Sequence, residues 1–418
     1  MQKTELAVVI TGLRRLEDLA PSVAAVARVV DAYALPASIW LPEDSRIPGL
    51  AATAASHHVG VVPQQGPGYG AALNAAFATI DADFIATIDC DGSHPPVLLR
   101  YLYEARHSAD IVIASRYVRQ GYAEMPWPRA IASASLNAAF RRLLDLPFHD
   151  LSSGYRLYRR AAVRRLQPGM SSFAVLQEIA IKAYCEGYVI REIPMHYRTR
   201  RQRSDSVSLG VDYARTLRAM WRLRNSVESC DYDTRAFYSV IPLQRYWQRR
   251  RYRIITRYVG DAARVLDAGC GSTQMLNGAP QTVGMDPQLR KLRFMQVPGR
   301  LLVNGSTFAL PFKSGAFDVV VSSQVIEHLV PDPEIFNELV RCVRSGGLLV
   351  LGTVDYGSWQ WPLIERAYGV VKPTGYVDEH ITHYTRQSLF ALIARLGLTV
   401  EDHQYIFGGE IIVKARKP

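Results

Sequence analysis

Short apolar runs alternate with helical patterns through the first half of the chain. The apolar runs are LAVVIT, SIWL, VGVV, FIATID and DIVIAS, and helical patterns cover about residues 18–31 and begin again at Ala71. Strands that alternate with helices are typical of a mainly parallel sheet, because a helix carries the chain back across it. The pattern therefore predicts an α/β domain in this half.

The same alternation begins again after about residue 262. The runs here are RVLDAG, TVGMD, FDVVVSS and LLVLGTV, followed by TVEDHQYIF and GEIIVKA, which we expect to pair as a hairpin. A chain of 418 residues is too long for one ordinary core and suits two domains. We place the boundary near residue 228, which gives domains 1–228 and 229–418.

Two arginine-bearing helices are expected between these halves, over about residues 207–225 and 245–257. The first is amphipathic, so it could lie on a membrane surface or pack on its own domain. The net charge is +11, and the segment 191–257 holds 16 arginines against six acidic residues. Such a block indicates an anionic partner, either substrate phosphates, anionic lipid or nucleic acid, or else a solvated junction. No base-reading module accompanies it, so we do not expect nucleic acid.

The composition suits a folded cytoplasmic protein. The five cysteines form no CxxC pair, which favours neither a zinc site nor a disulfide framework. The first residues, MQKTELAVVITGL, lack the features of a signal peptide, and no apolar run approaches the roughly 18 to 20 residues that span a bilayer. We expect a cytoplasmic enzyme, either free or peripheral on the cytoplasmic face of the membrane.

The main motif of the first half is FIATIDCDGSHPP, a strand that ends in Asp89 and Asp91. Two carboxylates one residue apart can hold Mg²⁺ or Mn²⁺, because these ions prefer oxygen ligands. Such an ion would neutralise a diphosphate leaving group in sugar transfer from a nucleotide donor. The alternative is an acidic pair that only forms a turn.

Further motifs surround this pair. QGPGYGAALNAAF precedes it, and ASRYV, RAIASASLNAAF, HDLSSGYRLYRRAAV and EGYVIREIPMHYRTRRQRSDS follow it. In this order and spacing, residues 60–225 resemble the inverting glycosyltransferases of family 2, in particular the dolichyl- or polyprenyl-phosphate mannosyltransferases. The resemblance implies a GT-A fold, a nucleotide-sugar donor and a polyprenyl-phosphate or glycan acceptor.

The resemblance also assigns roles by position. Asp89 and Asp91 match the carboxylates that hold the metal and the donor, with Asp91 catalytic and Ser93 as an accessory ligand. A phosphate acceptor needs no strong base, whereas a hydroxyl acceptor would need one, for which the candidates are Glu178, on a helix, and Asp150. Glu178 and Asn137 could equally be structural, and any single arginine could be an ordinary surface residue. The other donor-side matches are Arg116, Arg129, Arg201 and Ser206, and the acceptor-side matches are Asp150, Ser153, Gly154 and Arg156.

Two departures from the family pattern concern the nucleobase. The first strand is followed by GLRRLED and the second ends in WLPEDSR, where Glu43, Asp44 and Ser45 are the nearest equivalents of the usual base-gripping residues. The choice between UDP and GDP donors therefore stays open, as does a domain that binds its ligand without transferring sugar.

The second half contains ARVLDAGCGSTQML, which has the pattern of a strand, a tight glycine turn and a helix. Gly269 and Gly271 would let the backbone approach a ligand, and Asp286, at the end of the next strand, would bind ribose hydroxyls. A dinucleotide-binding domain shares this pattern, and a purely structural turn would also account for it.

Later segments favour one of these alternatives. GSTFALPFKSGAFDVVVSSQVIEHLV and DEHITHYTRQSLFALIARLGLTV, in this order, resemble class I methyltransferases of the ubiquinone-biosynthesis O-methyltransferase type over about residues 245–418. The resemblance implies S-adenosylmethionine as cofactor and a Rossmann-like seven-stranded sheet with a final antiparallel pair. NAD is the second choice. By position, the cofactor-binding residues are Asp267, Gly269, Gly271, Asp286, Ser306 and Gln324.

His328 is the first candidate for the base that removes the acceptor proton, with His380 and His383 as alternatives. Some relatives carry a metal held by two glutamates and a histidine in this segment, but Gln324 replaces the first glutamate, so we do not predict that metal. Glu327 and His328 could also simply end a helix. Together the halves predict a bifunctional transferase, or a methyltransferase whose first domain only binds nucleotide sugar or glycan.

Overall fold

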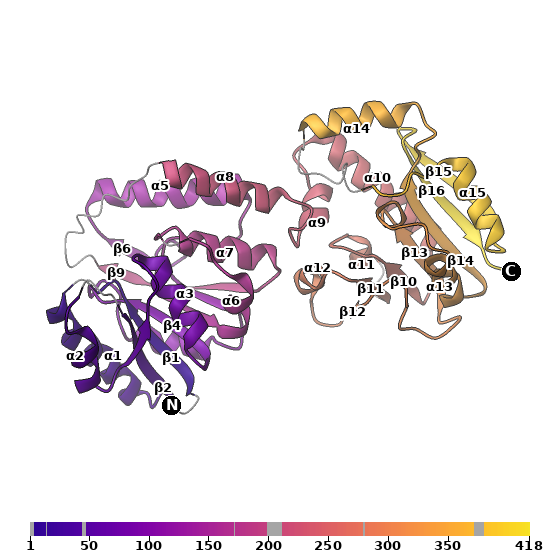
Figure 1. Cartoon of the computed structure of the whole chain (residues 1–418). Helices are drawn as coiled ribbons and strands as arrows, with labels where there is room; N and C mark the ends of the chain where they lie inside the picture. Colours follow the sequence, from indigo (N-terminus) through magenta and orange to yellow (C-terminus); the bar gives the residue numbers. More distant parts are fainter. Residues whose placement is uncertain are drawn as a thin grey trace. The chain divides into compact units, whose positions relative to one another are not determined.

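The computed structural model describes residues 4–13, 15–43, 47–170, 172–198, 211–278, 281–371 and 380–418. The chain forms two compact units, residues 1–224 and 225–418 (Figure 1). The division lies a few residues before the boundary that the sequence suggested. Each unit is an α/β structure around its own seven-stranded sheet.

The sheet of the first unit has the strand order β3-β2-β1-β4-β7-β5-β8. Only β7 runs antiparallel to its neighbours, so the prediction of a mainly parallel sheet is confirmed. The run LAVVI is buried on both faces of the sheet, as expected for a central parallel strand. The strands are β1 (Thr4–Thr11), β2 (Ala37–Glu43), β3 (Gly60–Pro63), β4 (Ala82–Asp89), β5 (Ile111–Ser115), β7 (Arg156–Arg159) and β8 (Ile190–Pro194).

Helices cover both faces of this sheet. Alternate residues of β1 divide between two cores, with Leu6 and Val8 packing on one face and Ala7 and Val9 on the other. One face is covered by α1 (Leu19–Ala32), α2 (Leu50–Ser56) and α4 (Leu98–Glu104), and the other by α3 (Tyr69–Thr79), α6 (Arg160–Leu166) and α7 (Val175–Cys185). A small parallel sheet joins β6 (Tyr122–Glu124) to β9 (His196–Arg198).

A third core lies under α5 (Trp127–Leu144) and α8 (Val211–Asn225). Leu217, Met220 and Leu223 of α8 pack there, and the buried guanidinium of Arg224 donates to the Asp145 carbonyl oxygen at 2.9 Å. Leu217, Met220 and Leu223 of α8 therefore pack on their own domain, which was one of the two alternatives for this helix, whereas Trp221 is 42% exposed.

The second unit has the strand order β12-β11-β10-β13-β14-β16-β15. The first five strands are parallel, and β16 runs antiparallel to both β14 and β15, so the hairpin prediction is confirmed. The strands are β10 (Val265–Ala268), β11 (Thr282–Asp286), β12 (Leu301–Asn304), β13 (Phe317–Ser323), β14 (Val343–Val354), β15 (Thr399–Ile406) and β16 (Glu410–Arg416).

Seven α-helices are assigned in the described part of this unit. They are α9 (Tyr232–Phe237), α10 (Pro242–Val259), α11 (Met275–Gly278), α12 (Leu289–Met295), α13 (Pro333–Cys342), α14 (Gln360–Val371) and α15 (Arg386–Arg395). The expected helix after the glycine turn is α11, which is only four residues long. Among the described residues of the whole chain, no helix combines the length and the apolar character needed to cross a bilayer.

Candidate functional sites

The acidic pair of the first unit lies at the carboxyl edge of its sheet. β4 ends at Asp89, in register with Thr11 at the end of β1, and the Thr11 hydroxyl donates to Asp89 Oδ1 at 3.0 Å. Asp91 Oδ1 accepts the Ser93 backbone N–H at 3.0 Å and also the Ser93 hydroxyl. Asp89 is buried and Asp91 is half-buried.

These groups fit a divalent cation of the Mg²⁺ type. In proteins this ion is commonly held by one or two carboxylates, with substrate phosphates and water completing the shell. Asp89 and Asp91 supply two carboxylates, and the Ser93 hydroxyl lies against Asp91, as expected for an accessory group. The diphosphate of a donor would supply the remaining oxygens.

Gly154 lies against this acidic pair. It belongs to the loop that also contains Asp150 and Ser153, which we call the acceptor-side loop. A Cβ on Gly154 would lie 2.6 Å from the Tyr69 hydroxyl and 3.3 Å from Asp89 Oδ1, so only glycine leaves room for both groups. Burial and the charge of Asp89 hold the pKa of Tyr69 well above its usual value. Sequence reasoning missed Tyr69 and Thr11, although both stand in segments that it had marked, QGPGYG and the end of the first strand.

Arg116 and Asp150 form a buried, bidentate ion pair. Arg116 Nε donates to Asp150 Oδ2 at 2.8 Å and Nη2 donates to Oδ1 at 2.7 Å. Burial alone would raise the pKa of Asp150, but the charge and hydrogen bonds of Arg116 outweigh it, so this pKa lies below its usual value. Asp150 is therefore a weak base, and Arg116 could contact a donor phosphate only while it shares its charge with Asp150.

Arg156 supports the backbone of the acceptor-side loop. Its fully buried guanidinium donates to the backbone oxygens of Ser153, Leu176 and Leu151 at 2.7, 2.8 and 2.7 Å. Ser153 is also buried, and its N–H donates to Asp150 Oδ1 at 2.9 Å. These two residues therefore shape the loop through its backbone.

Glu178 is bound within the fold as well. Its oxygens accept the backbone N–H groups of Gly169 and Met170, both at 2.9 Å, and Lys182 Nζ lies 2.7 Å away. This carboxylate holds the turn before α7, which is the structural alternative named for it. Asn137 likewise holds the acceptor-side loop, because its Oδ1 accepts the Leu151 N–H at 2.8 Å.

Three further donor-side residues were expected from the sequence, namely Arg129, Arg201 and Ser206. Arg129 is half-buried in the first turn of α5. Arg201 and Ser206 lie outside the described residues. The last described residue before them, Arg198, donates its N–H to the Ser93 carbonyl oxygen at 3.2 Å, which ties β9 to the turn that carries Asp91.

In the second unit, protein side chains fill the space beside the two glycines. Gly269 has φ +83°, and a Cβ there would lie 2.3 Å from Val325 Cγ2. Gly271 has φ +54°, and a Cβ there would lie 2.6 Å from Asp233 Oδ2. The positive φ values fit the expected tight turn, but the close neighbours in the structure are Val325 and Asp233.

Asp233 comes from α9, a helix that the sequence did not reveal as part of this site. Its Oδ2 accepts the Ser272 N–H at 3.0 Å and the Ser272 hydroxyl at 3.2 Å, and it lies 3.1 Å from the buried Lys291 Nζ. The neighbouring Thr234 hydroxyl donates to the Ser272 carbonyl oxygen. The glycine turn is thus held by α9 as well as by its own sheet.

The turn is surrounded by negative charge. Asp286 Oδ2 accepts the Gly271 N–H at 2.8 Å, and burial raises the pKa of Asp286. Burial, followed by the charge of Asp286, raises the pKa of Asp267 to about 7. The carboxyl groups around the turn are those of Asp233, Asp267 and Asp286, and Lys291 is a nearby cation. This arrangement suits a ligand with net positive charge, such as one that carries both a sulfonium and an ammonium group.

Gln324 and Ser306 occupy different surroundings. Gln324 follows β13 with φ +61°, a costly backbone conformation outside glycine that is concentrated at functional sites, and no partner for its buried Nε2 is found among the described residues. Ser306 is exposed after β12, where its hydroxyl accepts the Phe308 N–H at 3.3 Å. Gln324 thus has the geometry of a ligand-facing residue, and Ser306 lies at the rim.

Histidines gather at the ends of β13 and β14. The rings of His328 and His380 are 4.9 Å apart, the Tyr356 hydroxyl is hydrogen-bonded to His380 Nδ1 at 2.8 Å, and Tyr356 stacks on His383 at 3.9 Å. Burial and the two other imidazoles lower the pKa of His380 to about 4. All three candidate bases therefore belong to one cluster. This cluster lies at the same carboxyl edge of the sheet as the glycine turn.

Glu327 joins this cluster, and its ligand atoms with those of His328 and His380 lie within 4.8 Å of one another. Burial raises the pKa of Glu327 to about 8, so at neutral pH it would have to lose a proton to bind a cation. The three side chains are close enough to share one ion, with a donor set different from the one considered in the sequence.

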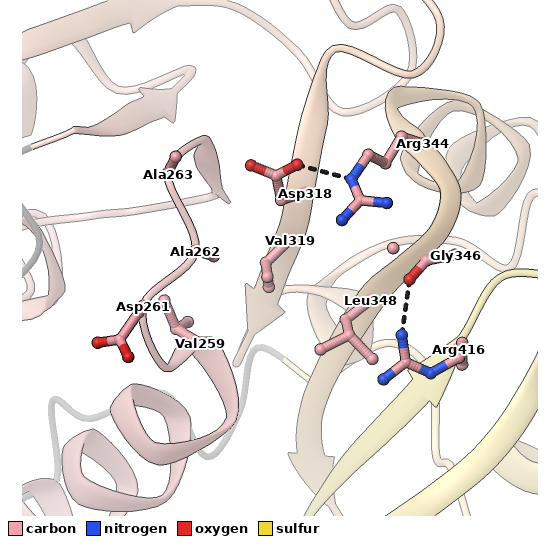
Figure 2. Close-up of a pocket in the computed structure, with 11 residues that line it drawn as sticks. Val259, Asp261, Ala262, Ala263, Asp318, Val319, Arg344, Gly346, Leu348 and Arg416 are labelled. Carbon is pink, nitrogen blue, oxygen red and sulfur yellow. Dashed lines mark hydrogen bonds and ion pairs between the residues drawn. The ribbon is translucent and has the colours of Figure 1, made fainter.

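A surface hollow of 320 Å³ lies elsewhere on this unit (Figure 2). It is lined by the first residues of β13 and β14 together with Arg344 and Arg416, and an ion pair of 2.6 Å joins Arg344 to Asp318. These are the amino ends of the parallel strands. Ligands of open α/β sheets bind at the carboxyl ends, so this hollow belongs to neither candidate site.

Sequence comparison identifies each half. Residues 8–167 match the model of glycosyl transferase family 2, and residues 242–403 match that of a methyltransferase domain. The chain is 32% identical over 129 residues to polyprenol monophosphomannose synthase of Mycolicibacterium smegmatis, covering 28% of this chain and 46% of the relative. It is 35% identical over 153 residues to an uncharacterized methyltransferase of Mycobacterium sp. strain KMS, covering 32% and 58%. The chain thus spans about half the length of each of these relatives.

Among solved structures, the second unit is similar to a methyltransferase of Thermotoga maritima described as S-adenosylmethionine-dependent, possibly a histamine N-methyltransferase. The identity is 18% and the TM-score 0.38, covering 44% of this chain and 94% of that one. The two family matches and the two sheets lead to one conclusion. This chain joins a family 2 glycosyltransferase domain of GT-A type to a class I, Rossmann-like methyltransferase domain.

Proposed function

We propose that the chain is a bifunctional transferase. Its first domain would transfer a sugar, with inversion, from a nucleotide-sugar donor to a polyprenyl-phosphate or glycan acceptor. Its second would methylate a hydroxyl of a related sugar or lipid-linked product with S-adenosylmethionine. The observation that carries the proposal is that each sheet has a partly buried acidic cluster at its carboxyl edge. In the first domain this cluster is the Asp89 and Asp91 pair, which fits a divalent cation. In the second domain the acidic side chains surround the glycine turn.

Sugar transfer requires stabilisation of the leaving diphosphate. Asp89 and Asp91 would hold Mg²⁺ or Mn²⁺, and the ion would supply charge neutralisation for that group. Thr11 fixes the Asp89 carboxylate, and Arg116 adds positive charge beside the loop that includes Ser153. A phosphate acceptor is supported because it is already ionised, whereas the two candidate bases, Asp150 and Glu178, are bound by Arg116 and by backbone amides.

Methyl transfer requires alignment and removal of one proton. Asp267 and Asp286 would bind the cationic and ribose parts of the cofactor, whose sulfonium supplies the methyl group. His328 would accept the acceptor's hydroxyl proton as the oxygen takes the methyl group, with His380 and His383 as the alternatives beside it. Gln324, whose buried amide nitrogen has no hydrogen-bond partner in the described part of the chain, would orient the reacting groups.

A second candidate is a methyltransferase whose first domain only binds nucleotide sugar or glycan. It is supported by the neutralising contact of Asp150 with Arg116, which reduces the positive charge available to a donor diphosphate. Separate assays with Asp91→Asn and Asp267→Ala would distinguish the two. The bifunctional proposal predicts loss of sugar transfer in the first variant and loss of methyl transfer in the second. Sugar transfer that is unchanged in Asp91→Asn would overturn the metal assignment.

The proposal also includes a place of action. A polyprenyl-phosphate acceptor is membrane-bound, so we place the enzyme in the cytoplasm with peripheral contact to an anionic membrane. The basic composition of the segment 191–257 supports this placement. Liposome flotation tests it, since equal recovery with neutral and anionic vesicles would contradict it.

A further inference from the structure

Large apolar side chains are exposed together at one end of the methyltransferase unit. Leu243 and Tyr246 lie in the first turns of α10, Trp359 and Leu363 lie at the start of α14, and Phe407 lies in the turn between β15 and β16. Their exposed fractions run from 47% for Tyr246 to 75% for Trp359. We call these five residues the apolar rim.

Side-chain contacts join the three elements of the rim. The rings of Tyr246 and Phe407 are 5.2 Å apart. A Cβ on Gly409, in the same turn as Phe407, would lie 2.9 Å from Ile364 of α14 and 3.6 Å from Trp247 of α10. Figure 1 shows α10, α14 and the start of β16 at the same end of the unit.

The exposed positions follow helical spacing on both helices. On α14 they are Trp359, just before the helix, Pro362, Leu363 and Arg366. On both helices the exposed stripe begins with apolar residues and continues into arginine, so side chains that suit the acyl boundary and side chains that suit anionic headgroups lie on the same surface.

On α10 the exposed positions include Leu243, Tyr246, Arg249 and Arg253. The charge on this helix has one sign. α10 contains six arginines and no acidic residue. Arg251 is used inside the fold, where its Nε lies 2.6 Å from the fully buried Glu410.

Arg249 and Arg253 are instead exposed further along the same face of α10, where Arg249 lies over the Phe237 ring at 5.6 Å and Arg253 Nε donates to the Arg249 carbonyl oxygen at 3.3 Å. Exposed apolar groups beside exposed arginines are complementary to a bilayer that contains anionic lipid.

We propose that the apolar rim, with Arg249 and Arg253, rests on an anionic membrane surface and holds the methyltransferase unit there. The inference rests on the proposed function, to which it adds a route for a lipid-linked acceptor. Trp361 lies against Gly409 at the rim and stacks on His380 at 6.1 Å, so the residues just inside the rim reach the histidine cluster. The membrane contact is thereby placed on the second unit, which carries the apolar rim.

The test is co-flotation of the full chain with phosphatidylcholine vesicles, alone or mixed with phosphatidylglycerol. The double variant Trp359→Ser/Leu363→Ser should weaken binding to the mixed vesicles about tenfold or more, because two large side chains no longer enter the interface. The matched control Val297→Ser/Leu301→Ser also removes two exposed apolar side chains from this unit and should float as the original chain does.

The charge part of the surface has its own variant. Arg249→Gln/Arg253→Gln should reduce binding to mixed vesicles by about fivefold per arginine and leave binding to neutral vesicles unchanged. The control Lys313→Gln/Arg395→Gln removes two exposed charges elsewhere and should have little effect. Circular dichroism of each variant confirms that it is folded.

Two results would overturn the inference. One is equal flotation of the rim variants and the original chain. The other is a rim variant that changes the oligomeric state in size-exclusion chromatography without changing flotation, which would show that a second copy covers the rim. Flotation requires neither catalytic activity, so if flotation follows the prediction but no acceptor is methylated, only the proposed function fails.

Discussion

Cofactor binding to the second unit should depend on pH through Asp267. Burial, followed by the charge of Asp286, raises the pKa of Asp267 to about 7, so below neutral pH this carboxyl is protonated in the ligand-free chain. A cationic ligand beside it favours the ionised form and lowers that pKa again. Binding should therefore release a proton, and affinity should increase as the pH rises toward 7.

The size of the effect follows from the fraction of chains that have Asp267 ionised. With a pKa of about 7, that fraction is about one half at pH 7 and about one thirtieth at pH 5.5, so the apparent affinity for S-adenosylmethionine should change about 15-fold between them. The raised pKa of Asp286 acts in the same direction. The ligand's own amino group, with a pKa of about 8, stays protonated across this interval.

Isothermal titration calorimetry measures both quantities. Titrations near pH 6 in two buffers of different ionisation enthalpy should show release of about 0.9 proton per cofactor bound. The control Asp267→Asn should bind more weakly at neutral pH and keep only the smaller pH dependence that Asp286 contributes. An affinity that is constant between about pH 5.5 and 7, with no proton release, would refute the assignment of Asp267 to the cofactor site.

Three substitutions extend the test to residues that the sequence did not mark or marked differently. Asp233→Asn should weaken S-adenosylmethionine binding at least about tenfold, because the Ser272 turn loses its ionised acceptor, and Lys291→Met in the same chain should recover part of the loss, as calorimetry would show. Gly154→Ala should weaken donor binding about tenfold. Adding Tyr69→Phe should relieve the 2.6 Å contact and restore donor binding. Unchanged donor affinity in Gly154→Ala would contradict the close packing. Arg156→Met should lower the free energy of unfolding of the first unit by roughly 3 kcal/mol in urea titrations, because three buried carbonyl oxygens lose their donor. A loss of catalysis without a loss of stability would instead indicate contact between Arg156 and the acceptor.

The strands themselves could be anticipated because each buried strand carries a mostly apolar run. LAVVI is apolar over its whole length, FIATID and FDVVVSS are mostly apolar up to their polar ends, and the three strands occupy central positions of the two sheets. The alternating pattern of TVEDHQYI similarly indicated the antiparallel hairpin at the end of the second sheet. The positions of Asp89 and Asp286 followed directly, since each comes at the end of such a run.

Side-chain neighbours from distant segments could not be anticipated in this way. Asp233 reaches the turn at Ser272 across 39 positions of the chain, and nothing in the local pattern of α9 indicates that contact. A glycine in the sequence indicates a tight turn or a close approach, but it does not say whether a ligand or a side chain fills the space. At Gly269 and Gly271 the structure supplies that answer with Val325 and Asp233.

Acidic and basic residues were harder to assign than glycines. Arg156, Asp150 and Glu178 stand in motifs that suggest contact with ligands. In the structure Arg156 and Glu178 bind backbone groups, and Asp150 pairs with Arg116. A buried charge must be paired or hydrogen-bonded, so a conspicuous charged residue next to an active site is often occupied in holding its loop. Only the three-dimensional arrangement separates the two roles.

The central claim is that the two domains have independent ligand sites, one for a nucleotide sugar with its cation and one for a sulfonium nucleoside. Calorimetry of the full chain with UDP- and GDP-sugars plus Mn²⁺, and with S-adenosylmethionine, tests it directly when Asp91→Asn and Asp267→Ala are compared. The account predicts that Asp91→Asn loses metal-dependent binding of the sugar nucleotide alone, and that Asp267→Ala loses binding of S-adenosylmethionine alone. Undiminished binding of both ligands in both variants would contradict it.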